Sequence, residues 1–241
     1  AVSACYAAVA RFSEKLSIPI HPGASHTSLR RLDALVEAAA MWIEEHSTFA
    51  RQGGDLMSLD KTGDARLYDD VRRWLGDLAP LDQAFARAWV SNPWPAGVVE
   101  GHRIVAAEIG LCPYEGKQQR EPDLFSAPWT REARASHLLR RMAFTHALYR
   151  HYGQNSALLY RGLSLSGALQ APRNGTFVSA TFDKALATAH FDQRPHGLGV
   201  LTRQPVPVER LVMTFRETWA MNATFLEAEA LLLYEPGNLA F

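Results

Sequence analysis

Two glutamates lie at the start of an apolar segment near the C-terminus, where charged side chains do not stabilise a packed core. The segment TFLEAEALLLYEPG runs from Thr224 to Gly237 and carries Glu227 and Glu229 two residues apart. Side chains alternate along a strand, so both carboxylates are expected on one side, about 7 Å apart. Like charges repel and burial opposes ionisation, so this arrangement costs the fold free energy. A carboxylate pair here indicates a functional site, although an exposed hairpin end would also accommodate it.

Three more polar side chains lie in apolar segments upstream. Arg161 ends the run LLYRGL and precedes Gly162, whereas Ser179 and Thr181 share one side of FVSATF just before an expected helix. A guanidinium can bind phosphate or carboxylate through paired hydrogen bonds, and a hydroxyl can orient a carboxylate. Taken singly, each has a structural alternative: an arginine that reaches solvent at a strand end, and hydroxyls that cap the next helix.

The elements that must position these side chains differ between the two parts of the chain. Apolar spacing predicts helices over 28–47, with Ser28 as N-cap, and over 64–90 with a break. A further helix is expected over 130–153, capped by Thr130 and stopped by glycine at its end.

After residue 153 the pattern changes to short runs rich in strand-forming residues. One helix, 182–191, interrupts them, and the region 91–129 before them is expected to be mainly loop with one short helix or strand near Ile104. The expected strands are 157–163, 175–182, 199–206, 209–215 and 225–234. The fold class is therefore α+β, with a helical N-terminal lobe over 1–153 packed on a β-rich core over 154–241.

Composition argues against several classes of function, although it does not exclude a nucleic-acid partner. The 241 residues hold 25 basic and 25 acidic side chains, so no block of positive charge indicates a nucleic-acid or membrane surface. The two cysteines form no CxxC pair and the nine histidines show no metal-ligand spacing, so no metal site is expected. No apolar run approaches the roughly 20 residues of a membrane span, and the first residues lack the pattern of a signal peptide.

In their order, these motifs resemble the arginine–serine–glutamate class of mono-ADP-ribosyltransferases, which includes clostridial binary toxins and vertebrate ecto-enzymes. The similarity comprises Arg-Gly on a strand, Ser-x-Thr before a helix, Glu-x-Glu opening a last strand, and the ending EPGNLAF, and it covers roughly 157–241. It implies a split β-sandwich core with NAD, as substrate, bound in a cleft.

The resemblance also implies a role for each motif residue. The family cleaves the bond between nicotinamide and ribose, and the positive charge that develops on the sugar requires a fixed carboxylate. Glu229 would stabilise that cation and hold the ribose 2′-hydroxyl, while Glu227 would orient and help deprotonate the acceptor. Arg161 would grip the phosphate or ribose region of NAD, and Gly162 would present its backbone to the nicotinamide amide. Ser179 would position the catalytic glutamate and the ribose.

The remaining site assignments follow from less specific matches. Residues 179–181 are Ser-Ala-Thr, whereas the family often has Ser-Thr-Ser. The alanine side chain should point away from the site. Thr181 is assigned to the NAD-binding residues. Phe191 and Arg194 belong to a segment similar to the loop that folds over bound NAD. Trp219 lies where the family keeps its acceptor-recognition loop, although it could equally pack that loop down.

The predicted activity is transfer of ADP-ribose from NAD to an acceptor. A protein arginine is the favoured acceptor because the Glu227 carboxylate can pair bidentately with guanidinium; nucleic acid or a small guanidine compound are the alternatives. An NAD glycohydrolase that uses water, or a binding module without activity on the same fold, are the rival hypotheses. The protein would act in the cytoplasm or be delivered into a target cell as a toxin or effector.

Overall fold

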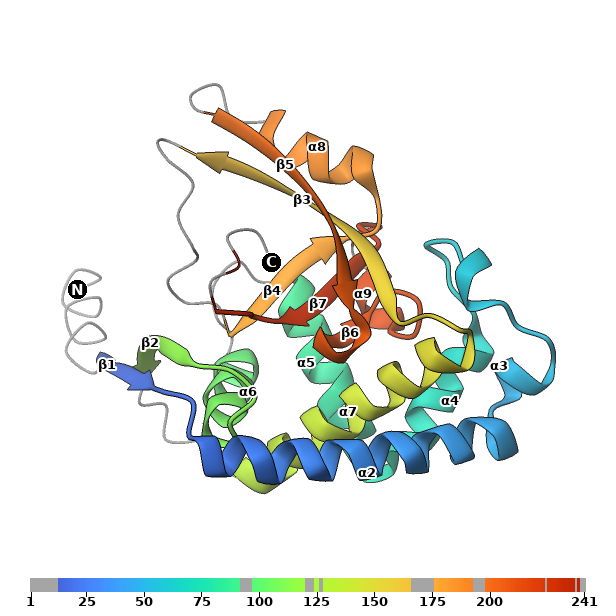
Figure 1. Ribbon diagram of the computed structural model, residues 1–241, viewed down its shortest axis with the longest axis horizontal. Coiled ribbons are helices and arrows are strands. Elements are labelled where there is room, and N and C mark those ends of the chain that lie inside the picture. Colours follow the sequence, from blue (N-terminus) through green and yellow to red (C-terminus); the bar gives the residue numbers. More distant parts are fainter. Residues whose placement is uncertain are drawn as a thin grey trace, which may run out of the picture.

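The computed structural model combines helices with two antiparallel sheets, which confirms the α+β class (Figure 1). It describes residues 13–91, 97–119, 124–125, 128–165, 176–192, 198–223, 225–236 and 238. Among these residues, no helix is long and apolar enough to cross a membrane.

Helices from the first part of the chain form a layer beneath the larger sheet (Figure 1). Long helices α2 and α7 lie against each other, and α4, α5 and α6 complete the layer. The helices and 3-10 turns are α2 (Pro22–His46), α3 (Thr48–Arg51), η1 (Leu56–Ser58), α4 (Ala65–Leu75), η2 (Gly76–Leu78), α5 (Ala79–Ser91), α6 (Gly97–Glu108), α7 (Arg131–His151), α8 (Lys184–Asp192), η3 (Val208–Arg210) and α9 (Trp219–Asn222).

The boundaries of α7 follow the sequence prediction, whereas the start of α2 does not. The Thr130 hydroxyl accepts a hydrogen bond from the Ala133 amide at 3.2 Å, and Gly153 beyond the helix has a φ of +69°. Helix α2 begins at Pro22, which needs no amide partner in the first turn. Ser28 is therefore buried inside the helix, and its predicted role as N-cap is wrong.

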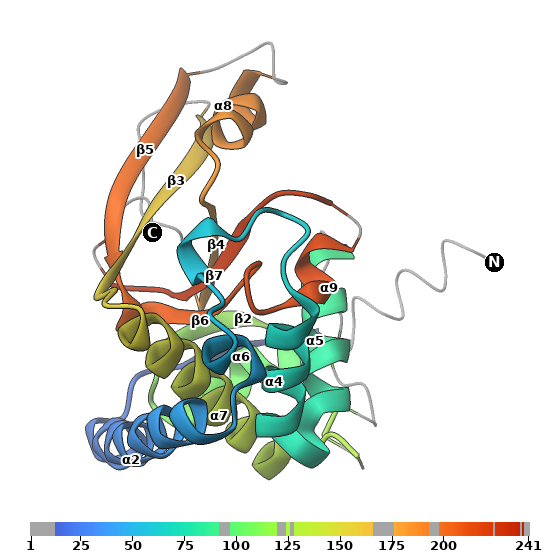
Figure 2. The same cartoon turned by 90° about the vertical axis from the view of Figure 1, so that its right-hand side faces the viewer.

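The larger sheet nearly divides into two halves. Its strand order is β5-β3-β4-β7-β6, and ten residue pairs join β3 to β5, from Ser156↔Pro207 to Leu165↔Leu198. Within the described residues, the one register pair between β3 and β4 is Tyr160↔Thr181. Figure 2 shows the antiparallel pair β3–β5 and α8 standing away from the helical layer, with β4, β6 and β7 next to that layer. The strands are β3 (Ser156–Leu165), β4 (Phe177–Thr181), β5 (Leu198–Pro207), β6 (Leu211–Thr214) and β7 (Glu229–Leu233), and the smaller sheet pairs β1 (Ser13–Ile18) with β2 (Tyr114–Gln119).

The last strand is shorter than the sequence predicted. Strand β7 begins at Glu229, and the residue before it, Ala228, has a φ of +46°. A positive φ is rare for alanine and breaks the alternation of side chains. Leu226 is consequently 57% exposed instead of lying in the core. From Glu229 onward the whole strand is buried, as the prediction of a strand inside a packed core requires.

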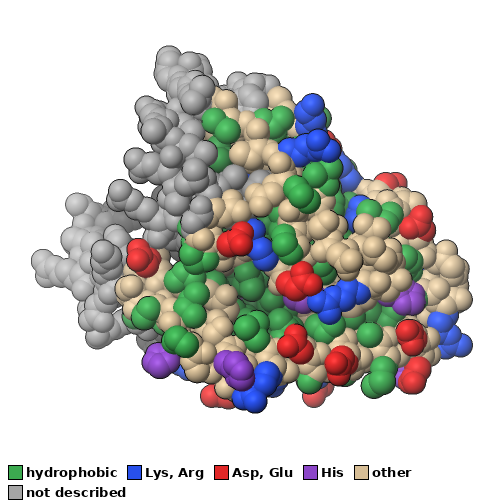
Figure 3. Space-filling model, viewed as in Figure 1, with side chains coloured by type: hydrophobic (Ala, Val, Ile, Leu, Met, Phe, Trp, Pro, Cys, Tyr) green, Lys and Arg blue, Asp and Glu red, His purple; other side chains and the backbone are tan. Residues whose placement is uncertain are grey.

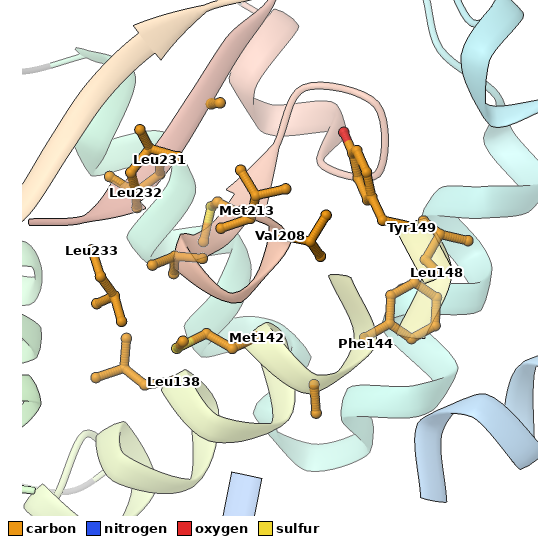
Figure 4. Close-up of a cluster of buried hydrophobic side chains, with 14 of the residues drawn as sticks. Leu138, Met142, Phe144, Leu148, Tyr149, Val208, Met213, Leu231, Leu232 and Leu233 are labelled. Atoms are coloured by element: carbon orange, nitrogen blue, oxygen red, sulfur yellow. The ribbon is translucent and has the colours of Figure 1, made fainter. Parts of the chain in front are cut away.

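One apolar cluster fixes β6 and β7 to the helical layer. Leu138 and Met142 of α7 belong to the same cluster as Met213 of β6 and Leu232 of β7, and Leu138 points toward Leu233 at the end of β7 (Figure 4). All five are buried, so the half of the sheet that carries Glu229 is held firmly against the helices.

Candidate functional site

A cavity of about 150 Å³ lies where β3, β4, the start of β7 and α8 meet. Six of the predicted site residues line it although they come from separate segments: Arg161, Gly162, Ser179, Thr181, Glu227 and Glu229. The other lining residues are Tyr160, Ala180, Leu186, Ala187 and His190. The fold thus gathers the motif residues that the sequence had singled out.

Glu229 is the most constrained of these side chains. It is only 6% exposed, and its Oε1 accepts two hydrogen bonds. The Ser179 hydroxyl donates one at 2.5 Å, and the Trp89 indole Nε1 donates the other at 2.7 Å. No described residue donates a hydrogen bond to Oε2. One carboxylate oxygen is therefore fixed by the protein, and the second can accept a hydrogen bond from a ligand.

The environment of Glu229 shifts its titration. Burial raises the pKa of the carboxyl from 4.5 to about 6; the Ser179 and Trp89 hydrogen bonds oppose this shift, and the nearby Glu227 charge adds to it. The side chain is still mostly ionised at neutral pH. An ionised carboxylate in a site from which water is largely removed interacts strongly with a developing positive charge.

Trp89 is the site residue that sequence reasoning missed. It belongs to α5 in the helical part, where its ring packs edge-on against Phe177 at 6.1 Å, with the Arg103 guanidinium 5.8 Å from the indole centroid. In the sequence it reads as one more apolar residue of an amphipathic helix, and 140 positions separate it from Glu229. No local signal marks it, because its role arises only from the packing of α5 against the sheet.

Ser179 does not cap the helix that follows it. That task falls to Asp183, whose Oδ1 accepts hydrogen bonds from the amides of Ala185 at 2.8 Å and Leu186 at 3.3 Å. The Asp183 carboxylate also pairs with Lys61 at 2.7 Å, and these contacts lower its pKa. The Ser179 hydroxyl is thereby left to orient Glu229.

Thr181 fixes the backbone beside the second glutamate. Its hydroxyl donates to the Glu227 carbonyl at 2.6 Å and accepts from the Asp183 amide at 2.9 Å. The positive φ of Ala228 changes the direction of the chain between the glutamates, yet both line the cavity. Glu227 is half-buried and Glu229 buried, so Glu227 is nearer to solvent.

Arg161 and Gly162 enter the cavity from β3. Their position relative to Ser179 depends on the Tyr160↔Thr181 pair and on the long antiparallel pairing of β3 with β5, in which Arg161 pairs with Thr202. The Thr202 hydroxyl donates to the Arg161 carbonyl at 3.1 Å. Burial lowers the pKa of the Arg161 guanidinium, which nevertheless stays charged at neutral pH.

Buried ion pairs connect the helices to the segment that follows β6, the strand paired with β7. Arg141 of α7 lies 3.1 Å from the Asp82 carboxylate and 3.4 Å from that of Glu217. Glu217 in turn accepts a hydrogen bond from the Thr214 amide at 2.6 Å. Thr214 ends β6, which pairs with β7, so these charges hold the strand that carries Glu229.

The structure separates Trp219 from this cavity. Its side chain is 49% exposed at the start of α9 and lines another cavity, of about 410 Å³, with residues of α4 and α5. Phe191 belongs to α8, but its side chain lies outside the described part, as does all of Arg194. In the described ranges, no group of three or more histidine, cysteine or acidic side chains could hold a metal ion.

Comparison with protein-family models, curated proteins and solved structures finds no match. The face in Figure 3 carries acidic and basic side chains interspersed, without a large area of one sign.

Proposed function

We propose that the protein is a mono-ADP-ribosyltransferase that cleaves NAD between nicotinamide and ribose and transfers ADP-ribose to an acceptor. The observation that carries this proposal is the carboxylate of Glu229, held by Ser179 and Trp89 inside a cavity that Arg161 and Glu227 also line. A buried, ionised and fixed carboxylate suits a reaction in which positive charge develops on a sugar.

On this proposal, each polar group of the cavity has a task. Oε2 of Glu229 would accept the hydrogen bond of the ribose 2′-hydroxyl and face the forming cation, while Oε1 stays bound to the protein. Arg161 would bind a phosphate of NAD, since a charged planar fork pairs well with phosphate oxygens. At about 150 Å³ the cavity is smaller than a typical site for a whole small molecule. It would therefore hold the nicotinamide–ribose end of NAD.

The nearly divided sheet supports a split β-sandwich core for this enzyme. The β-rich part, 154–241, would form that core, and the helical lobe, 1–153, would support it. Trp89 reaches Glu229 from the lobe, and Arg141 pairs with Glu217 across the same boundary. The two parts would accordingly act as one catalytic unit.

The position of Glu227 favours an arginine acceptor. Its side chain is half-buried at the outer part of the cavity and its carbonyl is fixed by Thr181. A carboxylate there can form two parallel hydrogen bonds to a guanidinium and help remove its proton. A protein arginine would be the acceptor, with nucleic acid and small guanidine compounds as the other acceptor classes to test.

Incubation with labelled NAD, and with agmatine, a mixed protein lysate or single-stranded DNA as acceptor, tests this proposal. Label covalently attached to protein or agmatine is the expected result, and attachment to DNA would replace the arginine acceptor by a nucleic acid. Release of nicotinamide with all label in free ADP-ribose would show an NAD glycohydrolase instead. Absence of any NAD cleavage would refute the proposed function.

A further inference from the structure

A second and more open cleft, of about 670 Å³, lies next to the Glu229 cavity. The two share Tyr160, and the hydrogen bond from the Phe182 amide to the Ala228 carbonyl, 3.0 Å long, runs between them. Three cations and two carboxylates line the cleft: Lys61, Lys184, Arg216, Asp60 and Asp183. Loop 59–62 of the helical part also lines the cleft.

Arg216 is buried in the wall of this cleft without a counter-ion. The residue is 7% exposed, and no carboxylate of the described chain lies within 4.0 Å of its guanidinium. Its Nε has no hydrogen-bond partner. Its guanidinium carbon lies near three aromatic rings, 4.5 Å from the centroid of Phe182, 5.6 Å from that of Phe215 and 6.0 Å from that of Tyr149. Its Nη1 makes long contacts with the Tyr149 hydroxyl at 3.4 Å and the Met57 sulfur at 3.5 Å. A buried cation with such partners is costly unless an anion joins it.

Both carboxylates of the cleft already have hydrogen-bond or ion-pair partners. Asp183 pairs with Lys61 and caps α8, while Asp60 accepts hydrogen bonds from the amide and hydroxyl of Thr62. Lys184, exposed at the first residue of α8, adds a second positive charge at the rim. Asp60 keeps its negative charge, so three cations and two carboxylates leave the lining a net charge of +1, with Arg216 in the wall and Lys184 at the rim as the cations that have no carboxylate partner among the described residues.

We propose that this cleft binds a phosphate-class anion, with Arg216 and Lys184 as its principal contacts. A guanidinium in the lining that has no carboxylate partner among the described residues, with an ammonium nearby, matches the donors that phosphate groups take in proteins. The cleft is a separate site from the one in which Arg161 and Glu229 lie.

The position of the cleft also indicates what kind of acceptor the enzyme would use, an inference that rests on the proposed function. It is lined by residues on both sides of the loop between β6 and β7, and Glu227 is the direct neighbour of Ala228 in its wall. An anion bound here would lie on the acceptor side of Glu227. The inferred substrate class is thus an acceptor that carries a phosphate close to the group that is modified.

Calorimetric titration with pyrophosphate at low ionic strength tests the site. We expect Arg216→Met to weaken binding about tenfold or more, the effect of losing one charged hydrogen bond. Lys184→Gln, at an exposed position, should weaken it by a smaller factor without affecting the fold. Arg140→Met is the matched control, because Arg140 also has an unpartnered Nε and stands over a ring, that of Trp74, but lies outside the cleft.

Specific outcomes overturn the proposal. It fails if pyrophosphate does not bind the wild-type protein, or if it binds Arg216→Met and Lys184→Gln with wild-type affinity. It also fails if Arg161→Met abolishes binding, since the anion then occupies the first cavity. A 5′-phosphorylated single-stranded oligonucleotide that binds through Arg216 more tightly than pyrophosphate identifies a nucleic-acid source; equal or weaker binding identifies a small phosphorylated compound.

Nicotinamide release separates this inference from the proposed function. Arg216→Met should still cleave NAD, because Arg216 does not line the Glu229 cavity. A wild-type protein that binds pyrophosphate through Arg216 but releases no nicotinamide would refute the transferase and leave the anion site standing.

Discussion

Replacement of Glu229 by glutamine should make the protein more stable at neutral pH. The carboxylate is buried, so its ionisation opposes folding, whereas an amide of the same shape carries no charge. Glutamine Oε1 can still accept the hydrogen bonds of Ser179 and Trp89, and its amide group would replace Oε2, to which no described residue donates a hydrogen bond. The substitution thus removes a cost without removing a contact.

The size of the gain follows from the pKa. Burial raises the pKa of Glu229 from 4.5 to about 6, and each unit corresponds to about 1.4 kcal/mol, which gives about 2 kcal/mol. Above pH 6 the carboxyl is ionised in both the folded and the unfolded state, so the full cost is present. Below pH 4.5 it is protonated in both states, and the advantage of glutamine should vanish.

Urea unfolding at pH 8 and at pH 5 measures this difference. Glu37→Gln, at an exposed position on α2, is the control and should change the free energy of unfolding by less than about 0.5 kcal/mol. Equal or lower stability of Glu229→Gln at pH 8, or a gain that does not shrink toward pH 5, would refute the argument that Glu229 is held ionised against a desolvation cost.

Three further substitutions test the roles assigned to the site. Trp89→Phe keeps an aromatic ring and removes the N–H that lowers the pKa of Glu229. We expect kcat to fall about tenfold and the acidic limb of the pH–rate profile to move to higher pH. An unchanged profile would show that Trp89 only packs against the site. Arg161→Lys keeps the charge but loses the planar fork, so calorimetry should show NAD binding weaker by about 1–3 kcal/mol, and unchanged affinity in a folded protein would count against a substrate contact. Glu227→Gln should reduce transfer at least about tenfold while hydrolysis of NAD persists; a parallel loss of both would place Glu227 in the cleavage step.

Features set by short-range chemistry were predictable from the sequence. Thr130 at the start of α7 and Gly153 after it act locally, and the structure has them as expected. The alternation within FVSATF put Ser179 and Thr181 on one side, and both line the cavity. The ordered motifs were sufficient to name six of its lining residues.

Features set by tertiary contacts were not predictable. The sequence of region 91–129 indicated mainly loop with one short helix or strand near Ile104, whereas the structure has the 12-residue helix α6 there. The glycine inside that helix, Gly101, lies where the Arg134 guanidinium crosses it, and a Cβ would come within 2.7 Å of that group. The contact of Trp89 with Glu229 and the positive φ of Ala228 likewise depend on the assembled sheet and helices.

Release of nicotinamide from NAD by the purified protein, compared with Glu229→Gln, tests the central claim most directly. The wild-type protein should release nicotinamide, and the variant should do so at least about 100-fold more slowly while binding NAD within a few-fold of wild type, because only the charge that faces the cation is lost. A variant that keeps more than about a tenth of the wild-type rate, or a wild-type protein that releases no nicotinamide, would contradict the role given to Glu229.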